Sequence, residues 1–263
     1  MYSDEHKRFI RKKKITSILV HLAQILLIVS LIVIWELLAK YEVINTFISS
    51  SPSRIVNTII KLYNDGNLFN HIWTTIYETL ISFGIGTLIG IVVAIVLWYS
   101  NFLYRIFDPY LTIINSLPKV AIGPIIIIYF GANIKSIIIM ALLISVIVTI
   151  ITVYNGFIST DQNRINLLKS FKASKGQIFR YVILPSSYPT IISSLKINIS
   201  MTLIGVIMGE FLVSKEGIGY LITYGSQVFN LNLVMSGIVI LLIVSYLMYL
   251  IVSYIEKILI KND

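Results

Sequence analysis

The sequence predicts an all-α, polytopic transmembrane helix bundle of about six spans, and three observations support this fold class. Hydrophobic residues make up 57% of the 263 residues, and the mean hydropathy is +0.88, whereas soluble domains are about 45–50% apolar. Charged residues are only 13% of the chain, about half the usual share. The apolar runs are about 20–25 residues long, enough for a helix to cross about 30 Å of hydrocarbon, whereas a β-barrel shows alternating segments of about ten residues.

Composition also excludes several kinds of site. The absence of cysteine excludes disulfides, thiolate metal sites and cysteine nucleophiles. The three histidines (His6, His21 and His71) are scattered, so no metal site is expected. The net charge of +9 would suit nucleic acid, but the basic residues cluster beside the apolar runs, as in membrane proteins. No nucleic-acid partner is therefore expected.

The N-terminal part of the chain is a basic tail followed by an apolar run. Residues 1–14 hold six Lys/Arg, and Ile15–Ala39 follows them. A secretory signal peptide would have a shorter apolar region of about 7–15 residues and a cleavage site after it. The run is therefore interpreted as a retained first span, opening a single transmembrane domain of residues 15–257.

The remaining elements follow in order. Pro52 and Asn64-Asp-Gly66 predict turns around a short amphipathic helix that carries Ile55, Ile59 and Leu62. The other five spans are expected at about Thr74–Tyr99, Ile106–Phe130, Ile134–Phe157, Thr190–Val213 and Leu231–Ile255.

The distribution of basic residues predicts the orientation. Six spans place both termini on one side, and that side carries fourteen Lys/Arg against five on the other. Cytoplasmic loops carry the excess of Lys/Arg. Both termini and the loop of about 158–189 are therefore expected in the cytoplasm of a multi-pass membrane protein. The abundance of Ile, Lys and Asn indicates an AT-rich bacterial genome, so the expected membrane is the bacterial plasma membrane.

Two spans carry small residues four apart, Ser82-x3-Gly86-x3-Gly90 and Gly205-x3-Gly209. Such stripes allow helix backbones to approach closely. They serve either ordinary bundle packing or packing that also slides during transport.

The third span holds the candidate pore residues. Two prolines and a glycine in Asn115-Ser116-Leu-Pro118-Lys119-Val-Ala-Ile-Gly-Pro124 release backbone groups that protein or a water-filled cavity must satisfy. Lys119 is about 13 residues into the span, where ionisable groups usually have a function; the alternative is pairing with a carboxylate on a neighbouring helix. The candidate pore or substrate-path residues are Asn115, Ser116, Pro118, Lys119 and Glu210, of which Glu210 alternatively serves as a pairing residue. The remaining charged residues near span ends, Glu36, Glu78, Asp108, Lys196 and Glu256, are explained by solvation or snorkelling.

Asp161–Pro189 is the one long basic interruption in the second half of the chain. Asp161 is a plausible N-cap, and Ile165, Leu168 and Phe171 recur at helical spacing. This pattern predicts a short amphipathic helix that lies on lipid or enters a groove on a partner. A second helix, Ser174–Ile183, is expected to stop before Pro185.

The segment resembles the EAA loop of binding-protein-dependent ABC importer permeases. Ala173-Ser174 and Val182-Ile-Leu184-Pro185 fit that pattern, Asn166-Leu167-Leu168 stands at its Glu-Ala-Ala, and Lys172 stands at its glycine. Because lysine does not take a positive φ as easily as glycine, the turn is expected to differ or to be tightened by other means.

The resemblance extends over residues 71–255 and is closest to nitrate/sulfonate/taurine-type permeases. The segments that carry it are Pro118–Pro124, Phe130-Gly131, Glu210 and Gly217-Ile-Gly219-Tyr220-Leu-Ile.

This resemblance implies a type I ABC importer permease fold. It implies a cytoplasmic ABC ATPase dimer, an extracytoplasmic substrate-binding protein, surrounding lipid and a second permease copy, expected as a homodimer. The implied ATPase-coupling residues are Asn166, Leu167, Leu168, Phe171, Lys172, Ala173, Ser174, Leu184 and Pro185. The chain lacks G-x-x-x-x-G-K-[ST], so ATP and Mg²⁺ are expected on the partner ATPase. The chain itself is expected to be no enzyme and to hold no cofactor.

The expected cargo is a small anion such as a sulfonate, taurine or nitrate, to which Lys119 would be suited. A thiamine-precursor pyrimidine or another small nutrient is the alternative within the same machinery. A secondary transporter is the rival of another class, but it would need a coupling-ion site and usually internal repeats.

Overall fold

The computed structural model describes residues 4–260, and every regular element within that range is helical. The elements are α1 (Asp4–Lys40), α2 (Thr46–Ser49), α3 (Pro52–Asn64), α4 (Asn67–Tyr99), α5 (Asn101–Ser116), the 3₁₀ turn η1 (Lys119–Ile122), α6 (Gly123–Phe130), α7 (Ile134–Ile158), α8 (Gln162–Ser170), α9 (Lys175–Ile178), the π turn η2 (Phe179–Ile183), α10 (Leu184–Val213), α11 (Ile218–Gln227) and α12 (Leu231–Ile260). Five helices in this range are long and apolar enough to cross a membrane, or six if a bent pair forms one span. The predicted bundle of about six spans is confirmed.

Helix α7 is the centre of the bundle and packs between α4 and α10. The small-residue stripes explain the closeness of both contacts. A Cβ added at Gly90 of α4 would lie 2.6 Å from Cβ of Thr149, and one added at Gly205 of α10 would lie 2.5 Å from Cα of Ala141. Both stripes therefore press against α7 at distances that a larger side chain would not allow.

Helices α12 and α3 cover the other side of α10 and α4. Helix α12 buries Ile240, Val244 and Met248 in one apolar cluster, against which Ile59 and Leu62 of α3 also pack. Ser51 accepts a hydrogen bond from the Arg54 N–H at the start of α3, as N-cap serines commonly do. The predicted amphipathic helix is therefore present.

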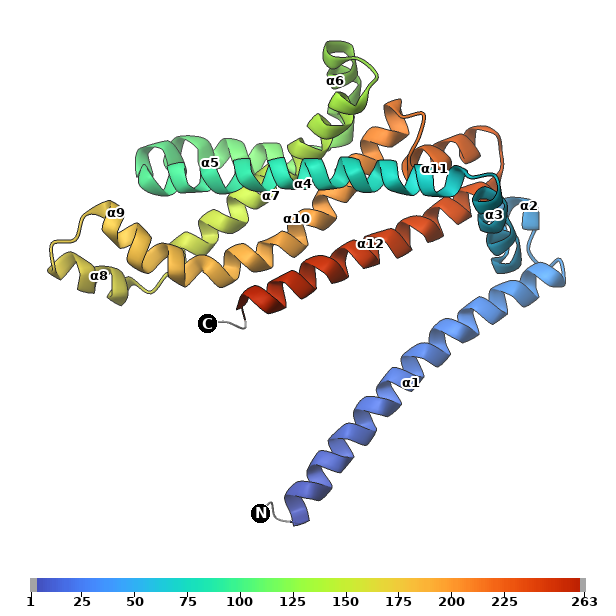
Figure 1. The fold of residues 1–263 in the computed structure, drawn as a ribbon, viewed down its shortest axis with the longest axis horizontal. Helices are drawn as coiled ribbons and strands as arrows, with labels where there is room; N and C mark the ends of the chain where they lie inside the picture. The colour runs from blue at the N-terminus through green and yellow to red at the C-terminus, as the bar shows by residue number, and fades with distance from the viewer. Residues whose placement is uncertain (1–3, 261–263) are drawn as a thin grey trace.

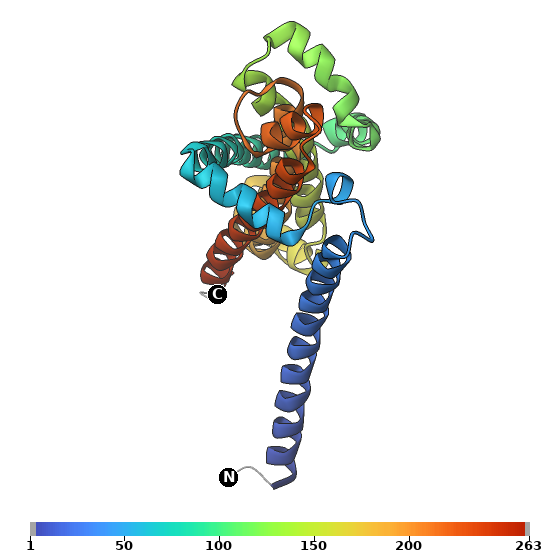
Figure 2. The ribbon, with the colours of Figure 1, turned by 90° about the vertical axis from the view of Figure 1, so that its right-hand side faces the viewer.

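Helix α1 projects away from the bundle in both views (Figures 1 and 2). None of the residues in its most apolar stretch is buried within the chain. It is tied to α3 near its end, where the Ser53 N–H donates to Glu36 Oε2 over 3.0 Å. The helix already begins at Asp4, so it includes most of the segment expected as a tail, while residues 1–3, and also residues 261–263 with Lys261, lie outside the described range.

The third expected span is broken rather than continuous. Helices α5 and η1–α6 meet at an angle of 91°, with Leu117 and Pro118 at the bend. Proline lacks an N–H and disfavours helical geometry in the residue before it, so α5 ends there. Beyond the bend, Gly123 lies so close to Leu212 and Met140 that a side chain would collide with them.

The expectation that a helix stops before Pro185 is wrong. Residues Lys175–Val213 form one uninterrupted helix, and the π turn η2 comes directly before the proline. In this turn the Leu184 N–H donates to the Phe179 carbonyl, five residues back instead of four. The wider turn accommodates the proline without ending the helix.

Candidate functional site

The polar segment between α7 and α10 folds into two short helices, α8 and α9, at one end of the bundle (Figure 1). The Asp161 side chain accepts a hydrogen bond from the Asn163 N–H over 2.9 Å at the start of α8, so the predicted N-cap is confirmed. Ser174 and Gln177 form a capping box at the start of α9.

The turn between these helices has Lys172 in the left-handed region, with φ of 57°. The Lys172 N–H donates to the Lys169 carbonyl over 2.9 Å, and the Ala173 N–H donates to the Leu168 carbonyl over 3.1 Å. These two bonds are a Schellman motif, in which glycine usually holds the left-handed position. Of the two expectations for this turn, a different geometry is wrong, and tightening by other means is what the structure has. The two backbone bonds and the packing of Leu168 and Ala173 on the core hold the lysine in the conformation that suits glycine.

Lys172→Gly should therefore stabilise the protein by about 1 kcal/mol, since left-handed geometry costs a residue with a Cβ about 1–2 kcal/mol and glycine's extra freedom in the unfolded chain offsets part of the gain. Lys169→Gly, three residues earlier and inside α8, is the matched control and should destabilise by about 1 kcal/mol. Thermal unfolding of the purified variants measures both. A loss of stability in Lys172→Gly would contradict the assigned turn geometry.

Helix α9 is fixed to the ends of α4 and α7. Lys175 Nζ donates to the Tyr99 carbonyl over 2.8 Å and lies 5.5 Å from the centroid of the Trp98 ring. The Phe179 ring lies 5.0 Å from the Trp98 ring and 5.5 Å from the Phe157 ring, measured between centroids. Phe179 belongs to η2, which continues from α9 into α10, so the ends of α4, α7 and α10 meet at this point.

The nine candidate coupling residues divide into two groups by exposure. Phe171 and Leu167 are 74% and 59% exposed, and Asn166 and Lys172 are also exposed. Leu168 and Ala173 are half-buried and pack on the chain's own core. Ser174 caps α9, and Leu184 and Pro185 begin α10. The exposed candidates are thus Asn166 and Leu167 of α8 with Phe171 and Lys172 of the turn after it, and we call these four residues the docking face.

The candidate pore residues of the third span gather at its bend. Asn115, Ser116 and Pro118 are exposed, and Lys119 is half-buried. Lys119 Nζ donates to the Asn115 carbonyl and lies 3.4 Å from Asn115 Oδ1. The lysine therefore caps the C-terminal end of α5, where the helix dipole is negative, instead of pairing with a carboxylate on another helix.

Glu210, the fifth candidate pore residue, lies in the interior, near the end of α10 that is far from α8. Its side chain is 1% exposed. It accepts one hydrogen bond from Thr75 Oγ1 over 2.6 Å and another from the Gly219 N–H over 2.5 Å. These bonds join α4, α10 and α11, so Glu210 acts as a pairing residue in this conformation. Glu78, which sequence reasoning explained by solvation, is only 2% exposed, because α4 turns it into the bundle beside Glu210.

Lys196 and Glu256, which sequence reasoning explained by solvation or snorkelling, instead pair with each other, and Ser193 of α10 bonds the same carboxylate of α12. The signal for this pairing was visible in the stripe Ser193, Lys196 and Ser200, which repeats polar groups on one face of an otherwise apolar span.

Comparison with known proteins identifies a family. The profile described as "Binding-protein-dependent transport system inner membrane component" matches residues 86–261. The chain is 27% identical over 231 residues to the putative aliphatic sulfonates transport permease protein of Bacillus subtilis, covering 88% of this chain and 84% of that protein. It is 28% identical over 190 residues to the formylaminopyrimidine transport permease protein of Halalkalibacterium halodurans, covering 72% of this chain and 75% of the relative.

Among solved structures, the fold is similar to a chain of the MetNI methionine ABC transporter in an inward-facing conformation. The TM-score is 0.64 at 20% sequence identity, over 72% of this chain and 94% of the other. This similarity supports the same type I permease fold.

Proposed function

The chain belongs to the family of inner membrane components of binding-protein-dependent transport systems and is a permease component of an ABC importer; from this premise we propose that it moves a small anionic solute, with ATP hydrolysis supplied by a separate ATPase. The match to residues 86–261 includes the bend, the docking face and Glu210. A secondary transporter no longer has support.

The observation that carries the coupling role is the docking face. Leu167 of α8 and Phe171 of the turn after it are both exposed, and together they leave apolar surface that a groove on a partner would bury. Helix α8 is bound through α9 to the ends of α4 and α7. An ATPase bound to α8 would therefore be connected through α9 to three spans, α4, α7 and α10.

The geometry of the bend supports a second copy of the chain as a partner. Asn115, Ser116 and Pro118 are exposed in a span that hydrocarbon cannot hydrate, so a second copy or a water-filled path must cover them. We assign this surface to the path between two copies of the chain. The basic side with α8 faces the cytoplasm and its ATPase dimer, and a substrate-binding protein delivers cargo at the end with α11.

The cargo proposal rests on chemistry and on the relatives. Lys119 at the bend suits an anionic group such as a sulfonate, taurine or nitrate. The formylaminopyrimidine permease among the relatives favours a pyrimidine as the second candidate cargo.

Purification of the tagged chain from its native membrane in mild detergent tests the proposal. A stoichiometric ATPase should co-elute with it, and uptake in reconstituted vesicles should require ATP and persist with an ionophore present. A chain that elutes alone and stable, or uptake that collapses with the ionophore, would overturn the proposal.

A further inference from the structure

Helix α10 carries a row of separate surface hollows along one face, beginning at the α8 end of the bundle, and we call this row the groove. Three cavities follow one another on this face. The first, of about 870 Å³, is lined by Arg164 of α8, by residues of η2 and α10 between Tyr181 and Pro189, and by Leu259 of α12. The second, of about 460 Å³, is lined by Lys196 and the end of α12. The third, of about 410 Å³, runs from Ser200 to Phe211.

Helical spacing places these linings on one stripe of each helix. On α10, Lys196, Ser200 and Ile204 lie four residues apart, and on α12, Ser245, Tyr249 and Ser253 do the same. Residues four apart share a helix face. The opposite face of α12 lines a different cavity of about 510 Å³, whose lining from Ile240 to Ile255 is wholly apolar.

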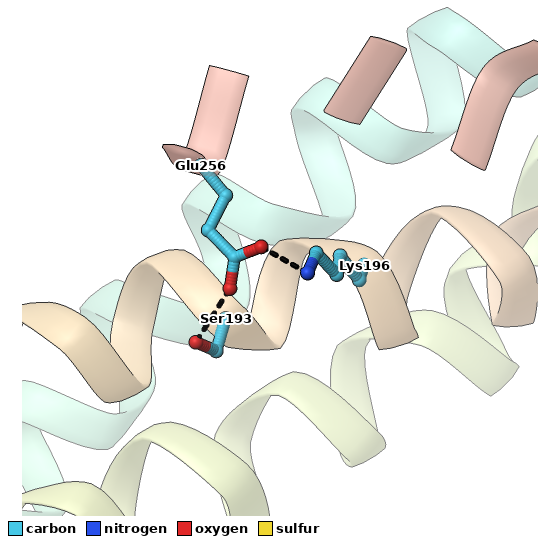
Figure 3. Close-up of polar contacts among 3 residues, drawn as sticks. All are labelled: Ser193, Lys196 and Glu256. Carbon is cyan, nitrogen blue, oxygen red and sulfur yellow. Dashed lines mark hydrogen bonds and ion pairs between the residues drawn. The ribbon is translucent and has the colours of Figure 1, made fainter. Parts of the chain in front are cut away.

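The polar stripe contains an ion pair between Lys196, within α10, and Glu256, close to the C-terminal end of α12. Lys196 Nζ pairs with Glu256 Oε2, and Ser193 Oγ donates to Glu256 Oε1 over 2.8 Å (Figure 3). The Lys196 ammonium also lies 5.9 Å from the centroid of the Tyr249 ring. Ionisable groups within spans are costly in lipid and face protein or a water-filled cavity.

The two charges are not equally accessible. The Lys196 side chain is 28% exposed and the Glu256 side chain 13%. Both carboxylate oxygens of Glu256 are occupied, by Lys196 and by Ser193, whereas an ammonium has three donors. Lys257 lines the same cavity. The formal charges of Lys196, Glu256 and Lys257 add up to +1. A solute in the groove therefore meets a net positive site.

We propose that Lys196 is an anion-binding station in this groove, which attracts the anionic group of the transported solute while Glu256 and Ser193 hold the lysine in place. The station's part in transport rests on the proposed function. Its electrostatic character stands on these contacts alone and is measurable without ATPase or binding protein.

Because the chain has no cysteine, single-cysteine labelling has no background. Ser253→Cys reports on the cavity of Lys196, and Ile251→Cys, on the apolar face of the same helix, is the matched control. Full-length variants in membranes are treated with two methanethiosulfonate reagents, one carrying an ethylsulfonate anion and one a trimethylammonium cation. Both reagents need water and an ionised thiol, so the anion should modify Ser253→Cys at least about tenfold faster than Ile251→Cys.

The ratio of anionic to cationic labelling at Ser253→Cys then isolates the charge. Lys196→Gln should lower this ratio about tenfold, Lys196→Arg should preserve it, and Glu256→Gln should raise it. If Lys196 only tethered α10 to α12, Lys196→Gln and Glu256→Gln would shift the labelling ratio in the same direction or leave it unchanged. Either result overturns the proposal. Equal labelling of Ser253→Cys and Ile251→Cys would place this face against lipid and overturn it as well.

Gel filtration of each variant verifies that it is folded, and the conservative Lys196→Arg keeps the proposal testable if Lys196→Gln aggregates. The outcomes also separate this inference from the importer role. A co-purifying ATPase with an unchanged ratio overturns the station only, whereas a shifted ratio in a chain without ATPase keeps the anion site and overturns the importer role.

Discussion

Replacing both Leu167 and Phe171 by alanine should abolish recruitment of the ATPase while leaving the permease folded. Each fully buried apolar side chain contributes roughly 1.5–3 kcal/mol, so losing two from an interface should weaken binding at least about 100-fold. Both side chains point away from the chain's own core, so the thermal stability of the isolated permease should stay unchanged. The measurement is ATPase recovered with the tagged variant, together with ATP-driven uptake.

The control uses a phenylalanine of equal exposure at the opposite end of the bundle. Phe229, in the turn between α11 and α12, is 74% exposed, as is Phe171. Phe229→Ala should recover the ATPase normally. Full ATPase recovery with the Leu167→Ala/Phe171→Ala variant would place the docking surface elsewhere. Leu168 is the wrong position for this test, because it packs on the core and its substitution would also disturb α8.

Gly205→Ala should destabilise the bundle, because the new Cβ would lie 2.5 Å from Cα of Ala141 and 3.2 Å from its nitrogen. These are backbone atoms of α7, so no side-chain rotation relieves the collision and α10 has to move away. Overpacking of this kind typically costs about 1–3 kcal/mol. The melting temperature of the purified variant in detergent measures the effect.

Gly84 is the control, because alanine at this position should change the stability in the opposite direction. An added Cβ at Gly84 of α4 meets nothing within 4 Å, and alanine is the better helix former by about 0.8–1.0 kcal/mol. Gly84→Ala should therefore melt at the same or a higher temperature than the parent. If both variants lost equal stability, the close α7–α10 contact would not be the reason.

The sequence was sufficient for the spans, because each is a long apolar run and hydropathy does not depend on tertiary contacts. The bend at Pro118 was partly foreseen, since proline and glycine release backbone groups locally, but its 91° angle depends on how Gly123 packs against α7 and α10. Local chemistry also gave the Asp161 cap and the amphipathic α3.

The features that were predicted wrongly or missed share a cause. Each depends on packing between residues that are distant in the sequence. Lys172 is an unfavourable residue for its turn, but the packing of Leu168 and Ala173 on the core holds it there. Pro185 would end an isolated helix, whereas the bundle keeps the helix intact through a π turn. Lys196 and Glu256 are 60 positions apart, so their pairing was invisible until α10 and α12 were placed side by side.

The unbroken helix through η2 has a mechanical consequence. Its 39 residues make a rod of about 58 Å at 1.5 Å per residue, and the anchored α9 is one end of it. Near the other end sits Glu210, bonded to Thr75 and to Gly219. A see-saw motion of about 5° around the middle displaces each end by about 2.5 Å, far more than the roughly 0.5 Å range of hydrogen-bond lengths. Rocking of α10 relative to α4 and α11 is therefore expected to break the bonds at Glu210, so that both ends of this helix change together without any signal passing through loops.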